Sequence, residues 1–350
     1  MRRSLLILIL LFTSLIAETM SSRTRLLMGT YATITLPDRE NGTTSELFSR
    51  LETIERSLST FDPNASLARL NATHAIPYDP ILADALRLST DYYRQTKGYF
   101  DVTIGSITKS LYHFGETTPH SPTKAQLHNA IRNIDGFHIG TTQITSEEGI
   151  VIDLGGMGKG FAVDRAAELL KRKGITQGII ALSGDIRCLH RCTVGIQSPF
   201  DEEALIAKVT AKIENLSIST SGTYRRYATQ KSEHHLIDPK SGEQGQAFVS
   251  VTLLSSADNA KIDAYATAVS VMSREEALAF LKMHDDIGFV VIKKNAETIA
   301  GNLKKFASIV WIGAQSDHQS NPSSTKKAAT KRNIKSGFKA AASNPNSDGR

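Results

Sequence analysis

The stretch that decides the fold is a glycine-rich loop that runs into a helix: Asp153-Leu154-Gly155-Gly156-Met157-Gly158-Lys159-Gly160-Phe161-Ala162-Val163-Asp164-Arg165. Residues 149–152 before it form a β-type run, and residues 162–172 after it show helical spacing up to a stop at Gly174. A strand, a glycine loop and a helix start expose backbone N–H groups to an anionic ligand, and Lys159 adds positive charge. The spacing matches neither a Walker A loop nor the dinucleotide-binding fingerprint. The loop therefore indicates either a phosphate site or a tight structural turn.

The composition is that of a globular protein with a basic C-terminal end. The chain has 350 residues, of which 40% are hydrophobic, so it can bury one large core or two. Most of the net charge of +6 lies from position 316 onward, where seven residues are basic and two are acidic. We predict that residues 316–350 form a disordered basic tail, solvated or in contact with a membrane surface. Nucleic-acid binding is disfavoured because aromatic residues are not interleaved with the basic ones.

The N-terminus has the pattern of an export signal. Arg2 and Arg3 precede the apolar run 5–16, which is too short to span a bilayer comfortably and fits the core of a secretory signal. We predict a signal peptide or an uncleaved anchor over residues 1–20 and a folded body over residues 21–315. The body is then expected on the periplasmic side of a bacterial inner membrane, soluble or N-terminally anchored.

Two cysteines, Cys188 and Cys192, are the only ones in the chain. Their spacing is weak evidence for a zinc site, because no companion cluster accompanies them. In an exported protein they form either a disulfide or two partly buried free thiols.

Helical and strand patterns mix without strict βαβ alternation, which predicts an α+β fold. The expected helices are 45–58, 80–96, 123–134, 258–272 and a capped helix from Ser273 through 283. The expected strands are 25–36, 178–182, 205–220, 248–254, 287–292 and 306–312, with a hairpin over 187–197.

Asp263 and Thr267 are the sharpest candidates for chemistry. They lie four residues apart and so share one face of the expected helix 258–272. A carboxylate and a hydroxyl make a hard, oxygen-only site suited to Mg²⁺. The alternative is structural: the threonine hydroxyl bonds back to its helix, and the aspartate is salt-bridged nearby.

Two other groups of residues carry a functional and a structural alternative. One histidine of His234-His235 is either a proton shuttle or an ordinary loop residue. Asp101, beside Tyr99 and Phe100, either helps to bind a flat ring or caps a turn over a core aromatic residue.

Taken together, the motifs resemble those of the ApbE family, the FAD:protein FMN transferases, over residues 28–312. Each motif is weak alone, but their order is highly specific. They are Met28-Gly29-Thr30; Leu58-Ser59-Thr60-Phe61 with Ser66 and Asn71; Gly98-Tyr99-Phe100-Asp101-Val102-Thr103-Ile104-Gly105; residues 153–165; Ser183-Gly184-Asp185-Ile186-Arg187; Ser219-Thr220-Ser221-Gly222; His235-Leu236-Ile237-Asp238-Pro239 with Gly242; and residues 263–268.

The resemblance implies an exported Mg²⁺-dependent enzyme with a T-fold-like α+β fold, in which helices flank mixed and antiparallel sheets. Such an enzyme cleaves FAD, attaches FMN through a phosphoester to a Thr or Ser of a partner protein, and releases AMP. The expected partners are FAD, as substrate, and an acceptor protein such as a membrane redox-complex subunit; no nucleic acid is expected. The alternatives are an FAD pyrophosphatase, which yields FMN and AMP, and a non-catalytic periplasmic flavin-binding protein.

The resemblance also assigns roles to single residues. Asp263 and Thr267 match the side-chain metal ligands, and Gly158 matches a backbone-carbonyl ligand. His235 matches a histidine that helps to activate the acceptor, with Asp238 as the next candidate base. The expected FAD contacts are Met28, Phe61, Tyr99, Phe100, Asp101, Asp153 and Phe161, with Lys159 near the phosphates. The chain departs from the family pattern at Ser183 and Gly158, where Gly and Ala are usual.

Overall fold

The computed structural model describes residues 19–118 and 120–312. The predicted signal segment, apart from its last two residues, and the predicted basic tail lie outside these ranges. Within them, no helix combines the length and apolar character needed to cross a membrane.

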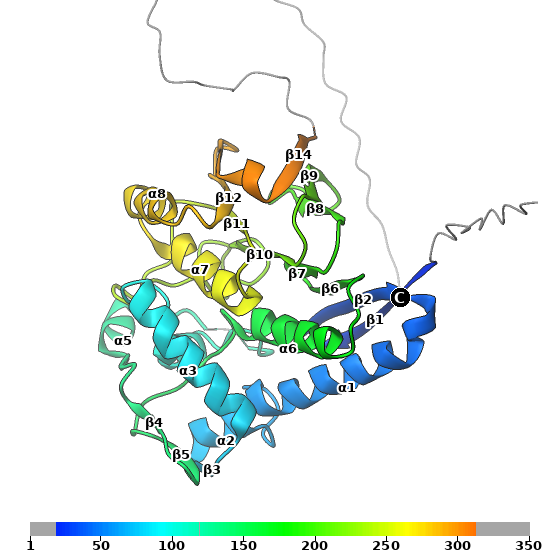
Figure 1. The fold of residues 1–350 in the computed structure, drawn as a ribbon. Coiled ribbons are helices and arrows are strands. Elements are labelled where there is room, and N and C mark those ends of the chain that lie inside the picture. Colours follow the sequence, from blue (N-terminus) through cyan, green and yellow to red (C-terminus); the bar gives the residue numbers. More distant parts are fainter. Residues whose placement is uncertain (1–18, 119, 313–350) are drawn as a thin grey trace, which may run out of the picture. The chain divides into compact units, whose positions relative to one another are not determined.

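An eight-stranded antiparallel sheet forms the framework, with the strand order β1-β2-β6-β7-β10-β11-β12-β13 (Figure 1). Its strands are β1 (Met20–Leu27), β2 (Thr30–Pro37), β6 (Ile179–Leu182), β7 (Asp185–Cys188), β10 (Leu216–Gly222), β11 (Ser250–Ser255), β12 (Gly288–Ile292) and β13 (Thr298–Gly301). The prediction of one strand over 25–36 was wrong, because Met28 and Gly29 form a tight turn between β1 and β2. Both have positive φ, 52° and 67°, which is the geometry that joins two antiparallel strands.

Two three-stranded sheets complete the β-structure. One has the order β14 (Ala307–Trp311), β9 (Leu205–Ala211), β8 (Thr193–Gln197), and the other β3 (Ala75–Pro77), β5 (Gln143–Ser146), β4 (Phe137–Ile139). The predicted single strand 205–220 is in fact β9 and β10, which belong to different sheets. The predicted hairpin 187–197 was also wrong, because β7 and β8 lie in different sheets. A Cys188–Cys192 disulfide closes the segment between them, which decides between the two cysteine alternatives.

Helices cover the main sheet and the space beside it. They are α1 (Asn41–Leu58), α2 (Ser66–Thr73), α3 (Pro80–Gln95), α4 (Gly105–Thr108), α5 (Lys124–Asn129), α6 (Gly158–Arg172), α7 (Asn259–Val271) and α8 (Arg274–Met283), with short 3₁₀ turns η1 (Asp38–Glu40), η2 (Val102–Ile104) and η3 (Leu303–Lys305). The predicted capping box of α8 is present, with Ser273 and Glu276 bonded reciprocally. Helix α5 is shorter than predicted and ends at Asn129.

The β-type run 149–152 belongs to no strand. Its end is instead fixed by a side chain, since Asn71 donates to the carbonyl of Ile152 and accepts from its N–H, both at 2.9 Å. The glycine-rich loop therefore starts from a clamped backbone, and α6 begins at Gly158, four residues before the helical spacing expected from 162.

Helices α6 and α7 pack on the main sheet and on each other (Figure 1). Almost every residue of α7 is buried, and small residues such as Ala260, Ala264 and Ala268 let neighbouring backbones come close. Helix α6 comes close to α7 at Gly160, where an added Cβ would lie 2.5 Å from the carbonyl oxygen of Asn259. Only glycine fits at this position without displacing one helix.

We expect Gly160→Ala to lower the free energy of unfolding by about 1–3 kcal/mol, the usual cost of overpacking. Gly158→Ala is the matched control, because an added Cβ there would meet its nearest atoms only at 4.0 Å. The control should be neutral or slightly stabilising, by at most about 1 kcal/mol, because alanine favours helix more than glycine does. Urea unfolding measures both, and equal stabilities would contradict the packing described here.

Candidate functional site

A cavity of about 650 Å³ opens where the glycine-rich loop, the β1–β2 turn, α7 and the segment around residues 224–239 meet. This volume is typical of a pocket that binds a cofactor-sized or drug-sized ligand. Eleven of the predicted site residues line it: Met28, Phe61, Tyr99, Phe100, Asp101, Asp153, Gly158, Lys159, His235, Asp263 and Thr267. Segments far apart in the sequence thus converge on one space.

Two predicted site residues are not among the residues that line this cavity in the described chain. Phe161 is 1% exposed and packs in the core, with the Arg165 guanidinium 4.7 Å from its ring centre. Asp238 shapes its own turn, since its carboxylate accepts from the Lys240 N–H and the Ser241 hydroxyl, both at 3.0 Å. Its position as a cavity base therefore has no geometric support.

The glycine-rich loop is held by Asp153. Its carboxylate accepts from the Gly155 N–H at 2.9 Å and from the Thr108 hydroxyl at 2.7 Å, and the ammonium of Lys109 lies 3.8 Å away. Burial opposes ionisation, but Lys109 and these hydrogen bonds outweigh it and lower the pKa of Asp153. The loop thus carries a fixed negative charge at its start.

Lys159 lies between two buried carboxylates. Its ammonium is 2.9 Å from Asp185 Oδ2 and 3.3 Å from Asp263 Oδ2. Burial and the neighbouring Asp185 raise the pKa of Asp263, while Lys159 opposes them. For Lys159, burial favours the neutral amine, but the two carboxylates outweigh it and raise its pKa above the usual value. Lys159 is therefore a cation at neutral pH, next to the cavity.

Asp263 and Thr267 bring only oxygen donors to the cavity. Thr267 donates not to its own helix but to the carbonyl of Gly156, at 3.2 Å, while Asp263 is salt-bridged to Lys159. The predicted structural alternative thus holds for the aspartate and not for the threonine. A Cβ at Gly156 would come within 3.2 Å of both Thr267 and Phe100, so a larger residue would have to displace these side chains by a few tenths of an ångström.

This donor set suits a hard cation such as Mg²⁺, which accepts few protein ligands and completes its shell with water or phosphate. Within residues 19–118 and 120–312, no group of three or more His, Cys, Asp or Glu residues is arranged to hold a metal ion. A metal here would therefore depend on hydroxyl, carbonyl and ligand oxygens beside the single carboxylate of Asp263.

His235, rather than His234, faces the cavity. His234 is 3% exposed and its Nε2 bonds the carbonyl of Gly245 at 3.0 Å. His235 Nδ1 lies 3.2 Å from the carbonyl of Arg226, which can only accept, so this nitrogen carries the hydrogen. The neutral ring then presents the Nε2 lone pair. Burial, with the nearby positive charge of Arg226, lowers the pKa of His235 to about 4.

On the aromatic side of the cavity, charged side chains contact the aromatic residues, and the sequence did not predict these contacts. Lys109 lies 4.1 Å from the ring centre of Phe61. Tyr99 is held from two sides, by Lys240 at 3.3 Å from its ring centre and by Glu276, which accepts from its hydroxyl at 2.6 Å. Asp101 accepts from the Thr103 N–H and hydroxyl, so it caps a turn and also lines the cavity.

Ser183 departs from the family pattern at a position that favours glycine. It has a φ of +56° in the tight turn between β6 and β7. Its hydroxyl lines the cavity and accepts from Arg225 at 3.4 Å. The serine therefore adds a polar group at this edge at the cost of some backbone strain.

We expect the ring of His235 to stay neutral from about pH 8 down to about pH 5, whereas an unperturbed histidine titrates near 6.5. Because the pKa in the folded state is lowered, its contribution to stability is present above pH ~6.5 and is lost as the pH falls toward 4. NMR of the ring protons measures this, with His235→Gln to assign the signal. A midpoint near 6.5 for that signal would contradict the buried, cation-flanked position.

Comparisons with known proteins identify the family of this chain. The sequence model of the ApbE family matches residues 28–291. The FAD:protein FMN transferase of Escherichia coli K12 is 26% identical over 293 residues, which cover 76% of this chain and 82% of that protein. A protein of the same name from Klebsiella pneumoniae strain 342 is 34% identical over 157 residues, which cover 44% of this chain and 49% of that protein.

Solved structures share the fold. The ApbE protein of Thermotoga maritima superposes with a TM-score of 0.72 at 19% identity, over 82% of this chain and 98% of that one. The flavin transferase ApbE from Vibrio cholerae gives 0.69 at 23% identity, over 83% and 99%. The predicted α+β architecture is confirmed.

Proposed function

This chain belongs to the ApbE family, and we propose that it is an FAD:protein FMN transferase that attaches FMN to a hydroxyl of a partner protein and releases AMP. One observation carries the proposal: His235, whose Nε2 is left with the lone pair, lines one cavity together with the cation Lys159 and the oxygen-bearing side chains of Asp263 and Thr267. A base, a fixed cation and hard oxygen donors are the groups that phosphoryl transfer from a diphosphate requires.

We assign the steps as follows. Lys159 binds a diphosphate oxygen and stabilises the negative charge that develops on it. Gly158, Asp263 and Thr267 would hold Mg²⁺, which supplies charge neutralisation and orientation of the phosphoryl group for in-line attack. Nε2 of His235 takes the proton of the acceptor Thr or Ser hydroxyl. The new bond joins that oxygen to the FMN phosphorus, the bond within the diphosphate breaks, and AMP leaves with its electron pair.

We further propose residues 21–315 as the transferase domain, exported to the periplasmic side of the inner membrane through residues 1–20. The Cys188–Cys192 disulfide supports this location, since disulfides persist in oxidising compartments. A subunit of a membrane redox complex is the partner that such a location suggests.

The test is mass spectrometry on the protein mixed with FAD, Mg²⁺ and an acceptor that carries a Thr flavinylation segment. The expected result is a mass gain on the acceptor that equals one FMN ester, with one AMP released, and loss of both with EDTA. AMP and FMN without acceptor modification would replace the transferase by an FAD pyrophosphatase. Bound FAD without any AMP would leave a flavin carrier.

In the same assay, Asp263→Ala should slow AMP release by about 100-fold or more, since the one carboxylate that would hold Mg²⁺ at the diphosphate is lost. Asp84→Ala is the matched control, because this carboxylate is exposed on α3 and pairs only with Arg87 among the described residues. A wild-type rate and an unchanged Mg²⁺ response in Asp263→Ala would remove Asp263 from the proposed site.

A further inference from the structure

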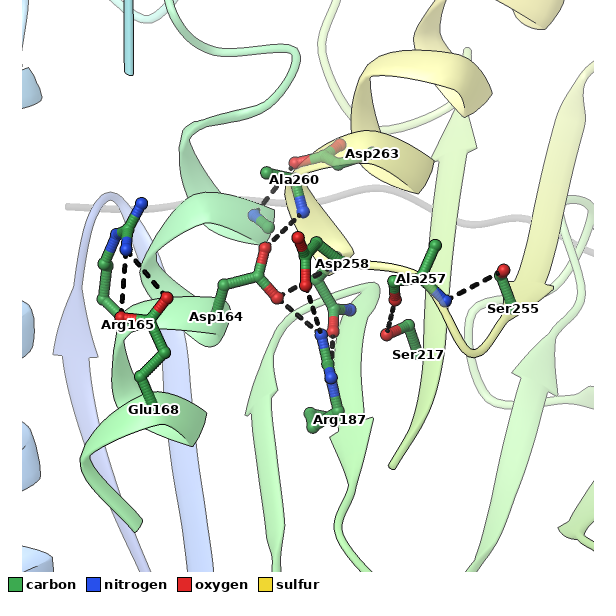
Figure 2. A network of polar contacts seen from close by, with 12 residues as sticks. Asp164, Arg165, Glu168, Arg187, Ser217, Ser255, Ala257, Asp258, Ala260 and Asp263 are labelled. Atoms are coloured by element: carbon green, nitrogen blue, oxygen red, sulfur yellow. Dashed lines mark hydrogen bonds and ion pairs between the residues drawn. The ribbon is translucent and has the colours of Figure 1, made fainter. Parts of the chain in front are cut away.

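The start of α7 is capped by a carboxylate that belongs to another helix. Its own N-cap residue, Asp258, makes no side-chain cap hydrogen bond within the described residues. Asp164 of α6 takes that place: its Oδ1 accepts from the Asn259 N–H and its Oδ2 from the Ala260 N–H, both at 2.8 Å (Figure 2). The first N–H groups of a helix need such acceptors when they are buried.

The capping is reciprocal between the two helices. Asp263 of α7 accepts from the Gly160 N–H, in the first turn of α6, at 3.1 Å. Asp164 lies four residues after Gly160, and Asp263 lies four residues after Asn259, so each carboxylate stands about one turn beyond the residue whose N–H is bonded by the other helix. Each helix therefore supplies a carboxylate that accepts hydrogen bonds from backbone N–H groups in the first turn of the other. The backbones of Gly160 and Asn259 are in contact between the two helices.

Arg187 on β7 ties this pair to the sheet. Its guanidinium donates to Asp164 Oδ1 at 2.6 Å and to Asn259 Oδ1 at 2.8 Å (Figure 2). The Asn259 amide donates in turn to the carbonyls of Ile186 and Ile218, at 3.0 and 3.2 Å. The three side chains of Asp164, Arg187 and Asn259 are buried, at 7%, 7% and 0% exposure. The hydrogen bonds of these three side chains all hold the start of α7 in place.

We infer that Asp164, held by Arg187, is a positioning residue for the proposed FMN transfer: it sets the place of Asp263 and Thr267 relative to Lys159. The inference rests on the proposed function only for the identity of the ligands. Asp164 and Arg187 are not among the described residues that line the cavity, so any effect of theirs on binding is indirect, through the elements that they hold. Asp263 follows Asn259 by one turn, so a shift of the helix start moves the carboxylate with it.

The carboxylate of Asp164 cannot be replaced by an amide without loss. It accepts three hydrogen bonds from two elements: one from Arg187 on β7, and two from adjacent N–H groups of α7 through different oxygens. In Asp164→Asn one of these oxygens is replaced by a donor, and Arg187 keeps only the more distant carboxylate of Asp258, at 4.0 Å. The double variant Asp164→Asn/Arg187→Gln also removes the buried cation that has lost its 2.6 Å partner, and it is used if the single variant fails to fold.

The experiment measures binding rather than turnover. FAD affinity is read from flavin fluorescence without metal, and Mn²⁺ affinity from electron paramagnetic resonance with FAD present. Both are measured at a temperature well below the thermal unfolding midpoint of each variant. We expect both Asp164 variants to weaken Mn²⁺ binding by about 10- to 100-fold, which is the usual effect of mutating a residue that holds a metal ligand in place. Turnover at saturating metal should fall less than the affinity does.

Asp79→Asn is the matched control. Asp79 also caps a helix with its carboxylate, accepting from the Ile81 and Leu82 N–H groups at the start of α3, and lies outside the residues that line the cavity. It should lower the unfolding midpoint and leave both affinities at the wild-type value.

A folded Asp164 variant with wild-type affinities for FAD and Mn²⁺ would overturn the inference and leave Asp164 a stabilising cap only. Wild-type protein that binds FAD but no Mn²⁺ would instead overturn the metal part of the proposed function. In that case the FAD affinity of the variants decides the role of Asp164: a loss relative to Asp79→Asn supports it, and equality refutes it.

Discussion

The backbone contact between Gly160 on α6 and Asn259 on α7 is the constraint on which the site depends. It places the first turns of two helices, far apart in the sequence, against each other at the edge of one cavity. Lys159 then reaches both Asp185 on the sheet and Asp263 on α7. The glycine-rich loop is thus fixed at both ends, by Asn71 before it and by α7 after it.

The charges around this contact are arranged for function rather than for stability. Asp164, Asp185 and Asp263 are all buried, and the cations Arg187 and Lys159 compensate them. Buried ion pairs seldom stabilise a fold more than apolar packing of the same volume would. A pocket that presents a permanent cation beside hard oxygen donors is, however, what a diphosphate ester needs if its charge is to be neutralised without water.

The sequence allowed prediction of the features that local chemistry determines. Spacing alone predicts the helix over 162–172 with its stop near Gly174, the capping box at Ser273, and the common face of Asp263 and Thr267; it does not predict that the helix begins at Gly158. Other features depend on distant partners. Lys240 and Glu276 reach Tyr99 from separate segments, and nothing in their neighbourhood signals it. Phe161 matched a motif but faces the core, because its side of α6 packs inward. The Met28-Gly29 turn was hidden in a strand pattern.

The most direct test of this account is a crystal structure with FAD and Mn²⁺ in which anomalous scattering locates the metal. The account expects a metal peak at the Asp263 carboxylate, the Thr267 hydroxyl and a carbonyl of the glycine-rich loop, with the FAD diphosphate as a further ligand and Nε2 of His235 facing the phosphorus. FAD bound outside this cavity, or a metal that contacts neither Asp263 nor Thr267, would contradict it.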